Sequence, residues 1–423
     1  MCPSRAGQPS GKRWPAEVSS PQYHHLPQHE GGTSMKLGSR VQNGRDFRKR
    51  VATAASLAVV LALGLTACTD DPTTDSTAGA GSQECIAAAD KFLEPWNELP
   101  TSLPASPPAR YTPLTKPVPA GGSAIALTTP IPSAQESSNA FVEAAKAAGW
   151  SAKNLNFDGS VPDLLAKFDQ AISAKPTAIW VQAFPAAAMQ EQLDAAKAAG
   201  IVVGMASVVD QPESYPGFAA VSNGGVTIEE IGRLHANWFM RDSRCAGNVA
   251  IFTLPFPIVE KGDQVFTDTV KANCPKCKVS SSLIQPQDLG TPKTASTIVS
   301  KLQSDPTTKY AFTVIGNLAN GVAPALKQAG INDIRIFGSS PDAESMAALR
   351  NGSNAWWVNQ NSVMQGWASF DSILRAVTSE QIQPDPGNYP LSVLTSNNVS
   401  DGTEVPVIPT NYQSDFKALW GVD

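Results

Sequence analysis

Short apolar runs alternate with longer amphipathic segments along most of the chain. The first apolar run, residues 123–129 (SAIALTT), precedes the amphipathic segment 133–150, and the same alternation then repeats to residue 361. Short apolar runs are typical of buried strands, whereas apolar residues recurring every three to four positions are typical of helices. Glycines such as Gly149 and Gly200 lie at the ends of several of the expected helices. The pattern predicts parallel sheets with helices on both faces.

Two sets of this pattern follow one another, which predicts an α/β fold of two doubly wound parallel-sheet lobes with a ligand cleft between them. In the first set the expected strands are 123–129, 153–159, 177–183 and 201–207, and the expected helices are 133–150, 161–174 and 186–200. In the second set the expected helices are 226–242, 258–273, 294–304, 320–330 and 343–352, and the expected strands are 248–254, 278–284, 310–316, 334–340 and 355–361.

The N-terminal region has a different pattern. Basic residues 48–50 precede an uncharged apolar segment, 51–67, and Cys68 follows directly. This order is typical of a secretory signal, and the apolar segment is short for a membrane helix, which needs about 20 residues. Residues 65–68 (LTAC) resemble the bacterial lipobox, which implies cleavage before Cys68 and a lipid on its sulfur. We expect an exported protein anchored to the outer face of the cell membrane through Cys68, with an uncleaved membrane helix as the alternative.

The domain boundaries follow from this reading. Residues 1–67 are expected to be the signal peptide, and a start at Met35 in place of Met1 would leave residues 1–34 untranslated. The polar Gly/Ser/Thr-rich segment 68–84 is expected to be a lipid-anchored tether without a core. Residues 85–119, rich in proline, are expected to pack over the surface as an N-terminal extension.

Composition narrows the class of function. The net charge of −5 and the absence of Lys/Arg clusters after the signal argue against nucleic acid as a partner. Three of the four histidines precede the signal, so a His-based metal site or catalytic triad would depend on His235 alone. The turn after the first strand, TTPIPSAQ, has neither a P-loop nor a G-x-G-x-x-G motif. We therefore expect no metal, no nucleotide or other cofactor, and no catalysis.

Four cysteines follow the expected anchor: Cys85, Cys245, Cys274 and Cys277. An even number in an exported chain predicts two disulfides, with three possible pairings. Cys274 and Cys277 have C-x-x-C spacing, but they follow an expected helix, whereas redox pairs begin one. Structural disulfides are the favoured interpretation, and redox and metal roles stay open as alternatives.

The segments 140–150, 171–183 and 193–207, followed by 320–340 and 352–361, resemble the type 1 periplasmic binding proteins of the ribose/galactose branch. The resemblance extends from about residue 121 to residue 423, and the tail resembles an actinobacterial lipoprotein subgroup. It implies three crossings between the lobes, near 222–225, 359–362 and 395–399. The first lobe would then contain 120–222 and 362–394, and the second 223–361 and 395–423.

The family also implies a function. Its members capture a small molecule, usually a sugar, by hinge closure and dock on an ABC permease. A monomer with a sugar or neutral polar ligand is therefore expected. The contact positions that the resemblance implies are Thr129, Pro130, Ile131, Gln182, Phe184, Ser207, Glu260, Lys261, Asn317, Asn320, Ser339, Ser340 and Gln360.

The chain departs from the family at several of these positions. Sugar binders usually carry Asp-Arg where this chain has Ala206-Ser207, and elsewhere Ser, Asn and Gln replace the charged residues. A site with few charges suits a neutral ligand held by amides and apolar contacts. Phe184 is the preferred stacking residue, whereas Trp180, Trp356 and Trp357 are expected mainly in the core.

Two other classes of function stay open. The same closed form could signal to a membrane receptor as a ligand-sensing lipoprotein without transport. An enzyme would need acid/base groups in the cleft, and the expected strand ends offer mainly Ser, Thr, Asn and Gln. His235 is expected to be a surface or hydrogen-bonded polar residue. A repressor of similar lobes is excluded by the export signal and the missing DNA-binding helices.

Overall fold

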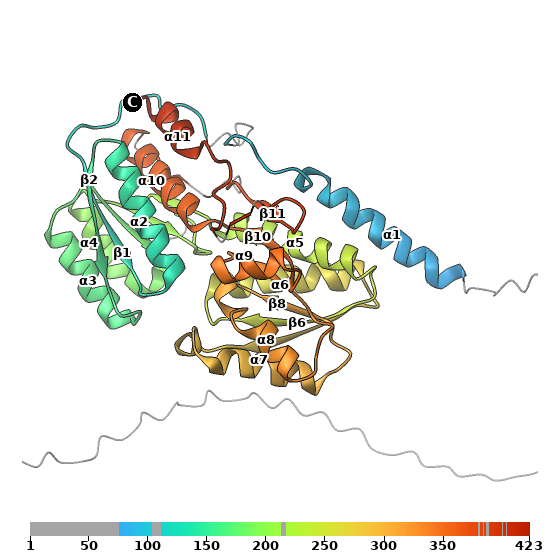
Figure 1. Cartoon of the computed structure of the whole chain (residues 1–423). Coiled ribbons are helices and arrows are strands. Elements are labelled where there is room, and N and C mark those ends of the chain that lie inside the picture. The colour runs from blue at the N-terminus through green and yellow to red at the C-terminus, as the bar shows by residue number, and fades with distance from the viewer. Residues whose placement is uncertain are drawn as a thin grey trace, which may run out of the picture. The chain divides into compact units, whose positions relative to one another are not determined.

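The computed structural model describes residues 76–103, 111–212, 217–379, 381–383, 385, 389–399, 401–402 and 404–423, which contain two α/β lobes (Figure 1). Each lobe is built on a mainly parallel sheet, which confirms the predicted fold class. The expected signal peptide, Cys68 and residues 69–75 of the tether lie outside the described residues. Within the described residues, no helix combines the length and hydrophobicity needed to cross a bilayer.

The first lobe contains a five-stranded parallel sheet. Its elements are β1 (Ser123–Thr128), α2 (Pro132–Ala147), β2 (Ser151–Asn156), α3 (Val161–Ser173), β3 (Ala178–Gln182), α4 (Gln190–Ala198), β4 (Val202–Ala206), β5 (Ala220–Ser222) and α10 (Ser362–Ser379). The strand order is β2-β1-β3-β4-β5, and the short strand β5 was not predicted from the sequence. Ile125 and Leu127 pack toward α3 and α4, whereas Ala124 and Ala126 face α2 and α10, as the two-residue period of a strand requires.

The second lobe contains a six-stranded sheet. Its elements are α5 (Gly225–Asp242), β6 (Asn248–Thr253), α6 (Pro257–Asn273), β7 (Lys278–Leu283), α7 (Pro292–Ser304), β8 (Tyr310–Thr313), α8 (Val322–Gln328), β9 (Arg335–Ser339), α9 (Ala343–Arg350), β10 (Asn354–Asn359) and β11 (Ser392–Leu394). The order is β11-β10-β9-β8-β6-β7, and β11 alone is antiparallel to its neighbour. Phe312, Phe337 and Trp356 from adjacent strands stack in series, with ring centroids 5.0 and 4.1 Å apart. Trp356, Trp357 and Trp180 are all fully buried, as expected of core residues.

The chain passes between the sheets at residues 223–224, between β5 and α5, and at residues 360–361, between β10 and α10. Both passages lie within expected segments. The third passage comes earlier than expected. The backbone of Gln383 still bonds Val221 at the edge of the first sheet (2.9 Å), and β11 then pairs with β10 in the second sheet.

The last helix, α11 (Tyr412–Trp420), returns to the first lobe. The indole of Trp420 donates to Asp371 on α10 at 3.0 Å and stacks with Trp367, 5.6 Å away. The structure thus differs from the expected assignment of residues 395–423 to the second lobe. The aromatic rings on the outer side of α10 are buried because α11 covers them. The order of strands and helices in the sequence does not show which helix covers this face.

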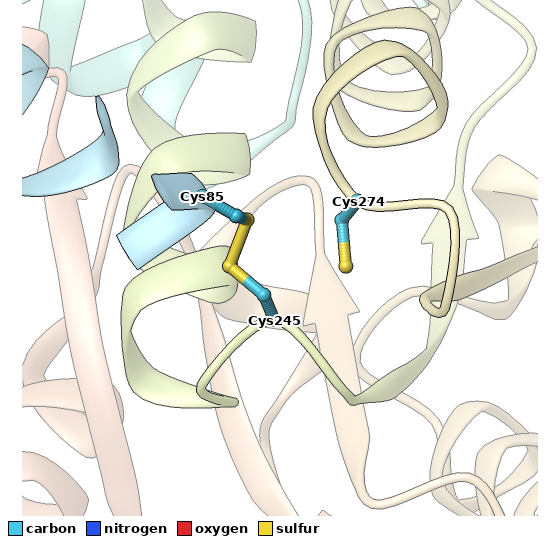
Figure 2. Close-up of side chains that lie close together, drawn as sticks. All are labelled: Cys85, Cys245 and Cys274. Atoms are coloured by element: carbon cyan, nitrogen blue, oxygen red, sulfur yellow. A yellow bond between two sulfur atoms is a disulfide. The ribbon is translucent and has the colours of Figure 1, made fainter. Parts of the chain in front are cut away.

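The N-terminal extension contacts both lobes. Helix α1 (Ser76–Leu93) lies along α5, and the Cys85–Cys245 disulfide joins it to the residues that follow α5 (Figures 1 and 2). The helix begins inside the segment 68–84, which was expected to be an unfolded tether. Ala89 and Leu93 are completely buried, so packing against the second lobe stabilises a helix that composition alone did not predict. Further along, the backbone of Leu114 bonds that of Leu419 in α11 at 2.8 Å.

Candidate functional site

A cleft of about 590 Å³ is lined by residues that follow the carboxyl ends of strands from both sheets. Thr129 follows β1, and Ser207 follows β4 in the first lobe. In the second lobe, Leu254 follows β6 and Ser340 follows β9. This is where ligands bind in open α/β sheets, because the strand ends bring loops together there. None of the described residues before Thr129 lines the cleft.

Side-chain amides form a continuous hydrogen-bond network along the cleft. Gln360 donates to Oδ1 of Asn223 at 2.6 Å, and Asn223 donates to Oε1 of Gln365 at 2.8 Å. Gln365 donates in turn to Oε1 of Gln182 at 3.0 Å and to Oγ of Ser207 at 3.1 Å. The network joins both crossing segments to the ends of β3 and β4. Each amide uses a donor and an acceptor, which a charged side chain could not do.

The backbone is left-handed at four positions that directly follow strands. Ala183, Ser207, Asn223 and Ser340 have φ angles of 66°, 56°, 49° and 48°, after β3, β4, β5 and β9 respectively. Non-glycine residues adopt this conformation at a cost of roughly 1–2 kcal/mol each. Strain of this kind persists where the surrounding structure holds it, and it gathers at ligand sites. Here it turns the chain sharply at the cleft and at the first crossing.

The two lobes present different chemistry to the cleft. The first lobe and the second crossing supply most of the hydroxyl and amide groups: Thr129, Ser133, Ser137, Gln182, Ser207, Gln360, Ser362 and Gln365. The second lobe supplies most of the apolar side chains: Ile228, Ile231, Leu254, Phe256, Ile258, Val259, Pro286, Leu289, Phe312, Val314 and Ile315. The cleft is therefore polar on one side and largely apolar on the other.

Charge is scarce in the cleft. Among the described residues that line it there is no Lys, Arg or His, and the carboxyl groups are those of Asp158 and Asp263. Asp158 is exposed, whereas Asp263 lies on α6 within the apolar side. Burial raises the pKa of Asp263 to about 7, and the neighbouring charge of Glu260 adds to the increase. Near neutral pH this carboxyl group is therefore divided between its acid and ionised forms.

His235 supports the cleft from within the second lobe. Its ring is fully buried, 4.6 Å from that of Phe312, and its Nε2 lies 2.8 Å from Oγ of Ser339. Desolvation lowers the pKa of His235 to about 3, so the ring is neutral over the physiological range. Of the two expectations for this residue, the surface position is wrong, and the hydrogen-bonded one holds for Nε2 but not for Nδ1, which is buried without a hydrogen-bond partner. His235 positions Ser339, which lines the cleft.

Most of the contact residues that the family resemblance implied line the cleft. They are Thr129, Pro130, Ile131, Gln182, Phe184, Ser207, Ser339, Ser340 and Gln360. Phe184 packs edge-on against Phe157, with centroids 5.4 Å apart. The positions agree with the expected ones because each residue ends a strand, lies within three residues after one, or lies at a crossing. Their contact with a ligand stays a prediction.

The other four implied residues do not line the cleft. Glu260 and Lys261 are exposed on α6, where Nζ of Lys261 pairs with Glu229 on α5 at 2.9 Å. Asn317 and Asn320 each donate to Oδ2 of Asp342 at 2.8 Å. The other carboxylate oxygen of Asp342 accepts a bond from the backbone of Ser345 and caps α9. These asparagines therefore stabilise the start of a helix.

Many residues that line the cleft were not predicted, and three polar residues of the site show why: Asn223, Gln365 and Asp263. Gln365 belongs to a helix whose buried face is otherwise mostly apolar, and a glutamine in that position was a signal that could have been used. Asp263 offered a similar signal, because it is an acidic residue next to the buried positions 258, 262 and 266 of α6. Asn223 is the first residue after β5, a strand too short to be recognised from its pattern.

The four cysteines form the two predicted disulfides, paired Cys85–Cys245 and Cys274–Cys277. The sulfur atoms of Cys85, Cys245 and Cys274 lie within 4.8 Å of one another (Figure 2). A thiolate is the form that binds metal, and these sulfurs are engaged in disulfides. The cluster lies outside the lining of the cleft.

Comparison with known proteins gives one family. Residues 127–381 match the family described as periplasmic binding protein domain. No curated protein sequence matches the chain.

Solved structures share the fold. One is an ABC transporter solute-binding protein from Burkholderia graminis C4D1M in complex with D-arabinose, 17% identical, with a TM-score of 0.59, covering 69% of this chain and 100% of that one. A second, from Agrobacterium vitis with bound allitol, is 19% identical, with a TM-score of 0.56, covering 66% and 97%. A third is GanP, a glucose-galactose binding protein from Geobacillus stearothermophilus, 15% identical, with a TM-score of 0.57, covering 66% and 99%.

Proposed function

This chain belongs to the periplasmic binding protein family, and on that premise we propose that it is the solute-binding protein of an ABC importer. It captures a small sugar-like or neutral polar ligand in the cleft between its lobes and delivers it to a membrane permease. The observation that carries this proposal is the cleft itself. Loops from the strand ends of both sheets line it, and hydroxyl and amide groups lie at its polar side.

Closure of the lobes on the ligand follows from the way they are connected. The crossings at 223–224 and 360–361 are short, so a few backbone torsions absorb the motion. A third connection involves Asp385, whose carboxylate accepts bonds from the backbone of Gly224 at 2.8 Å and of Thr227 at 3.1 Å. These bonds hold the start of α5 to the segment that leaves α10. The three connections act together as the hinge.

The proposal includes a lipid anchor on Cys68, export to the outer face of the cell membrane, and a monomeric binding protein. The lipobox-like residues 65–68 and the preceding apolar segment support the anchor. Metabolic labelling with a palmitate analogue tests it: the full-length chain incorporates the label, and the Cys68→Ser variant does not. Equal labelling of both proteins would refute the anchor at this residue.

Capture without catalysis fits the chemistry of the cleft. General acid/base catalysis needs a positioned group with a pKa near the working pH. Asp263 alone among the described lining residues has such a pKa, and most of the lining side chains of its lobe are apolar. The cleft is therefore suited to holding a ligand unchanged.

Thermal unfolding of the full-length chain in the presence of sugars, polyols, nucleosides and small amides tests capture. A ligand at a hundredfold excess over its Kd stabilises the native state by about 2.7 kcal/mol. One clear stabilising ligand would support the proposal and give the ligand class. If none stabilises and the purified protein releases no small molecule on denaturation, capture is refuted. Cross-linking in cells then separates transport, with a permease as partner, from signalling to a receptor.

A further inference from the structure

The cleft is divided into two chemically unlike sides, and a simple sugar would be held well by only one of them. A sugar ring carries hydroxyl groups around its whole rim, and each buried hydroxyl needs a hydrogen-bond partner. The polar side offers such partners through Ser133, Ser137, Gln182 and Gln365. The opposite side consists mostly of apolar side chains of α5, α6 and the neighbouring strand ends, which offer none, and its fewer polar groups are Asp263, Gln287, Ser339 and Ser340.

The charges of the cleft restrict the ligand further. Because no Lys, Arg or His is among the described lining residues, an anionic ligand would be buried without a compensating charge. Asp158 and Asp263 would repel it as well. Phosphorylated sugars and sugar acids are therefore disfavoured, and a neutral ligand remains.

The size of the cleft leaves room for more than one ring. Its volume of about 590 Å³ lies within the range of about 300–1,000 Å³ that is usual for small-molecule sites. When the lobes close, the apolar side would meet either the hydroxyl groups of a monosaccharide held on the polar side or water that remains beside it. Apolar surface left exposed in this way loses the free energy that its burial would release.

Resting on the proposed capture function, we infer that the ligand is amphipathic: a hydroxylated ring or chain that carries a neutral apolar group, as in an aryl or alkyl glycoside. The hydroxylated part lies against the amides of Gln182, Gln360 and Gln365, and the apolar part against Leu254, Phe256 and Val259. Asp263 is one of the polar groups that the second lobe brings to the cleft, with Gln287, Ser339 and Ser340, and it accepts a hydrogen bond from the ligand or donates one to it.

Matched glycosides test this inference directly. Calorimetric titration of the full-length chain compares free D-glucose, D-galactose, D-xylose and D-arabinose with their methyl and phenyl glycosides, in both anomeric forms. Within a sugar that binds, the phenyl glycoside is expected to bind about tenfold or more tightly than the methyl glycoside, because the second lobe covers the phenyl ring.

Two variants and one control test which side chains cause the tighter binding of the phenyl glycosides. Phe256→Ser and Val259→Ser change partly buried side chains that line the cleft, and both are expected to weaken the binding of phenyl glycosides more than that of methyl glycosides, which removes most of the phenyl advantage. The control is Val226→Ser, which changes a valine 44% exposed on α5 that does not line the cleft. It is expected to keep the phenyl advantage. Loss of the advantage in the control as well would overturn the assignment to the apolar side.

The remaining outcomes separate this inference from the proposed function. Free sugars that bind as tightly as their phenyl glycosides would overturn the amphipathic ligand and leave capture intact. If no glycoside binds, the neutral fluorophore N-phenyl-1-naphthylamine decides: enhanced fluorescence that falls in Phe256→Ser and Val259→Ser supports the inference, and no enhancement overturns it. Mass spectrometry of small molecules released from the denatured protein reports on capture independently.

Discussion

Gln360 and Asn223, which are 137 residues apart in the chain, share a hydrogen bond of 2.6 Å between the two short crossings. Asn223 also donates to Gln365, the residue that reaches Gln182 and Ser207 in the first lobe. One asparagine thus connects the hinge to the polar side of the cleft. A change at this position is expected to affect ligand binding and lobe closure together.

Replacement of Asn223 by Ala is expected to lower ligand affinity about tenfold or more and to destabilise the protein by about 1–3 kcal/mol, because the buried amide of Gln365 loses a partner. Titration with a ligand found by thermal unfolding measures the first effect, and denaturant unfolding the second. The control is Asn317→Ala, which loses a bond to Asp342 outside the cleft and is expected to keep the affinity. Equal affinity in both variants would contradict the role of Asn223.

Asp263 is expected to make stability fall as pH rises. Its pKa in the folded protein, about 7, exceeds the ordinary value of 3.8, so the folded state holds a proton that the unfolded state releases. The loss of stability caused by ionising this buried carboxyl group is absent below about pH 4 and fully present above about pH 7. Asp263→Asn should therefore raise the melting temperature at pH 8 and change it little at pH 4. A difference that is the same at both pH values would refute this.

His235 is expected to act in the opposite direction. Its folded pKa of about 3 lies below the ordinary value of 6.5, so the unfolded state binds a proton that the folded state excludes. Stability is then lost as pH falls below about 6.5 and continues to fall toward pH 3. His235→Gln, which is neutral at every pH, should lose less stability than the native chain between pH 7 and pH 4. Parallel stability curves for the two proteins would be evidence against this explanation.

The two disulfides are expected to contribute unequally. Cys85–Cys245 closes a loop with a sequence separation of 160, and Cys274–Cys277 one of 3. Chain entropy alone predicts contributions of about 5 and about 2 kcal/mol. Denaturant unfolding of Cys85→Ser/Cys245→Ser and of Cys274→Ser/Cys277→Ser compares them. The first pair should also expose α1 to proteolysis, and an unchanged cleavage pattern would show that packing holds this helix without the disulfide.

Close approach of α2 and α10 depends on Gly366. A β-carbon at this position would lie 2.4 Å from the carbonyl oxygen of Ser137, so Gly366→Ala must push the helices apart. A loss of about 1–3 kcal/mol is expected in denaturant unfolding. Gly225→Ala is the matched control, because the nearest atom to its β-carbon would be 3.7 Å away. If both variants are equally stable, the contact between α2 and α10 is looser than the structure indicates.

The sequence by itself determined the fold class and much of the polar side of the cleft. Alternation of apolar runs and amphipathic segments is a local property, so it indicated two parallel sheets without knowledge of any contact. Gln182, Ser207 and Ser339 end strands or directly follow them. The family resemblance implied these three as contact positions, and they lie at the cleft because parallel strands bring their carboxyl ends to one edge.

Only the tertiary structure decided the rest. The bond between Asn223 and Gln365 joins residues 142 positions apart, and the contact of α11 with α10 depends on which apolar surface is left uncovered. Asn317 was expected at the cleft and does not line it, whereas Asp263 was not expected there and does. The reason is that the direction of a side chain depends on its neighbours in space. Asn317 donates a hydrogen bond to Asp342, the residue that caps α9, and Asp263 lines the cleft. Packing between residues far apart in the sequence determines these contacts, so the local periodicity of the sequence does not reveal them.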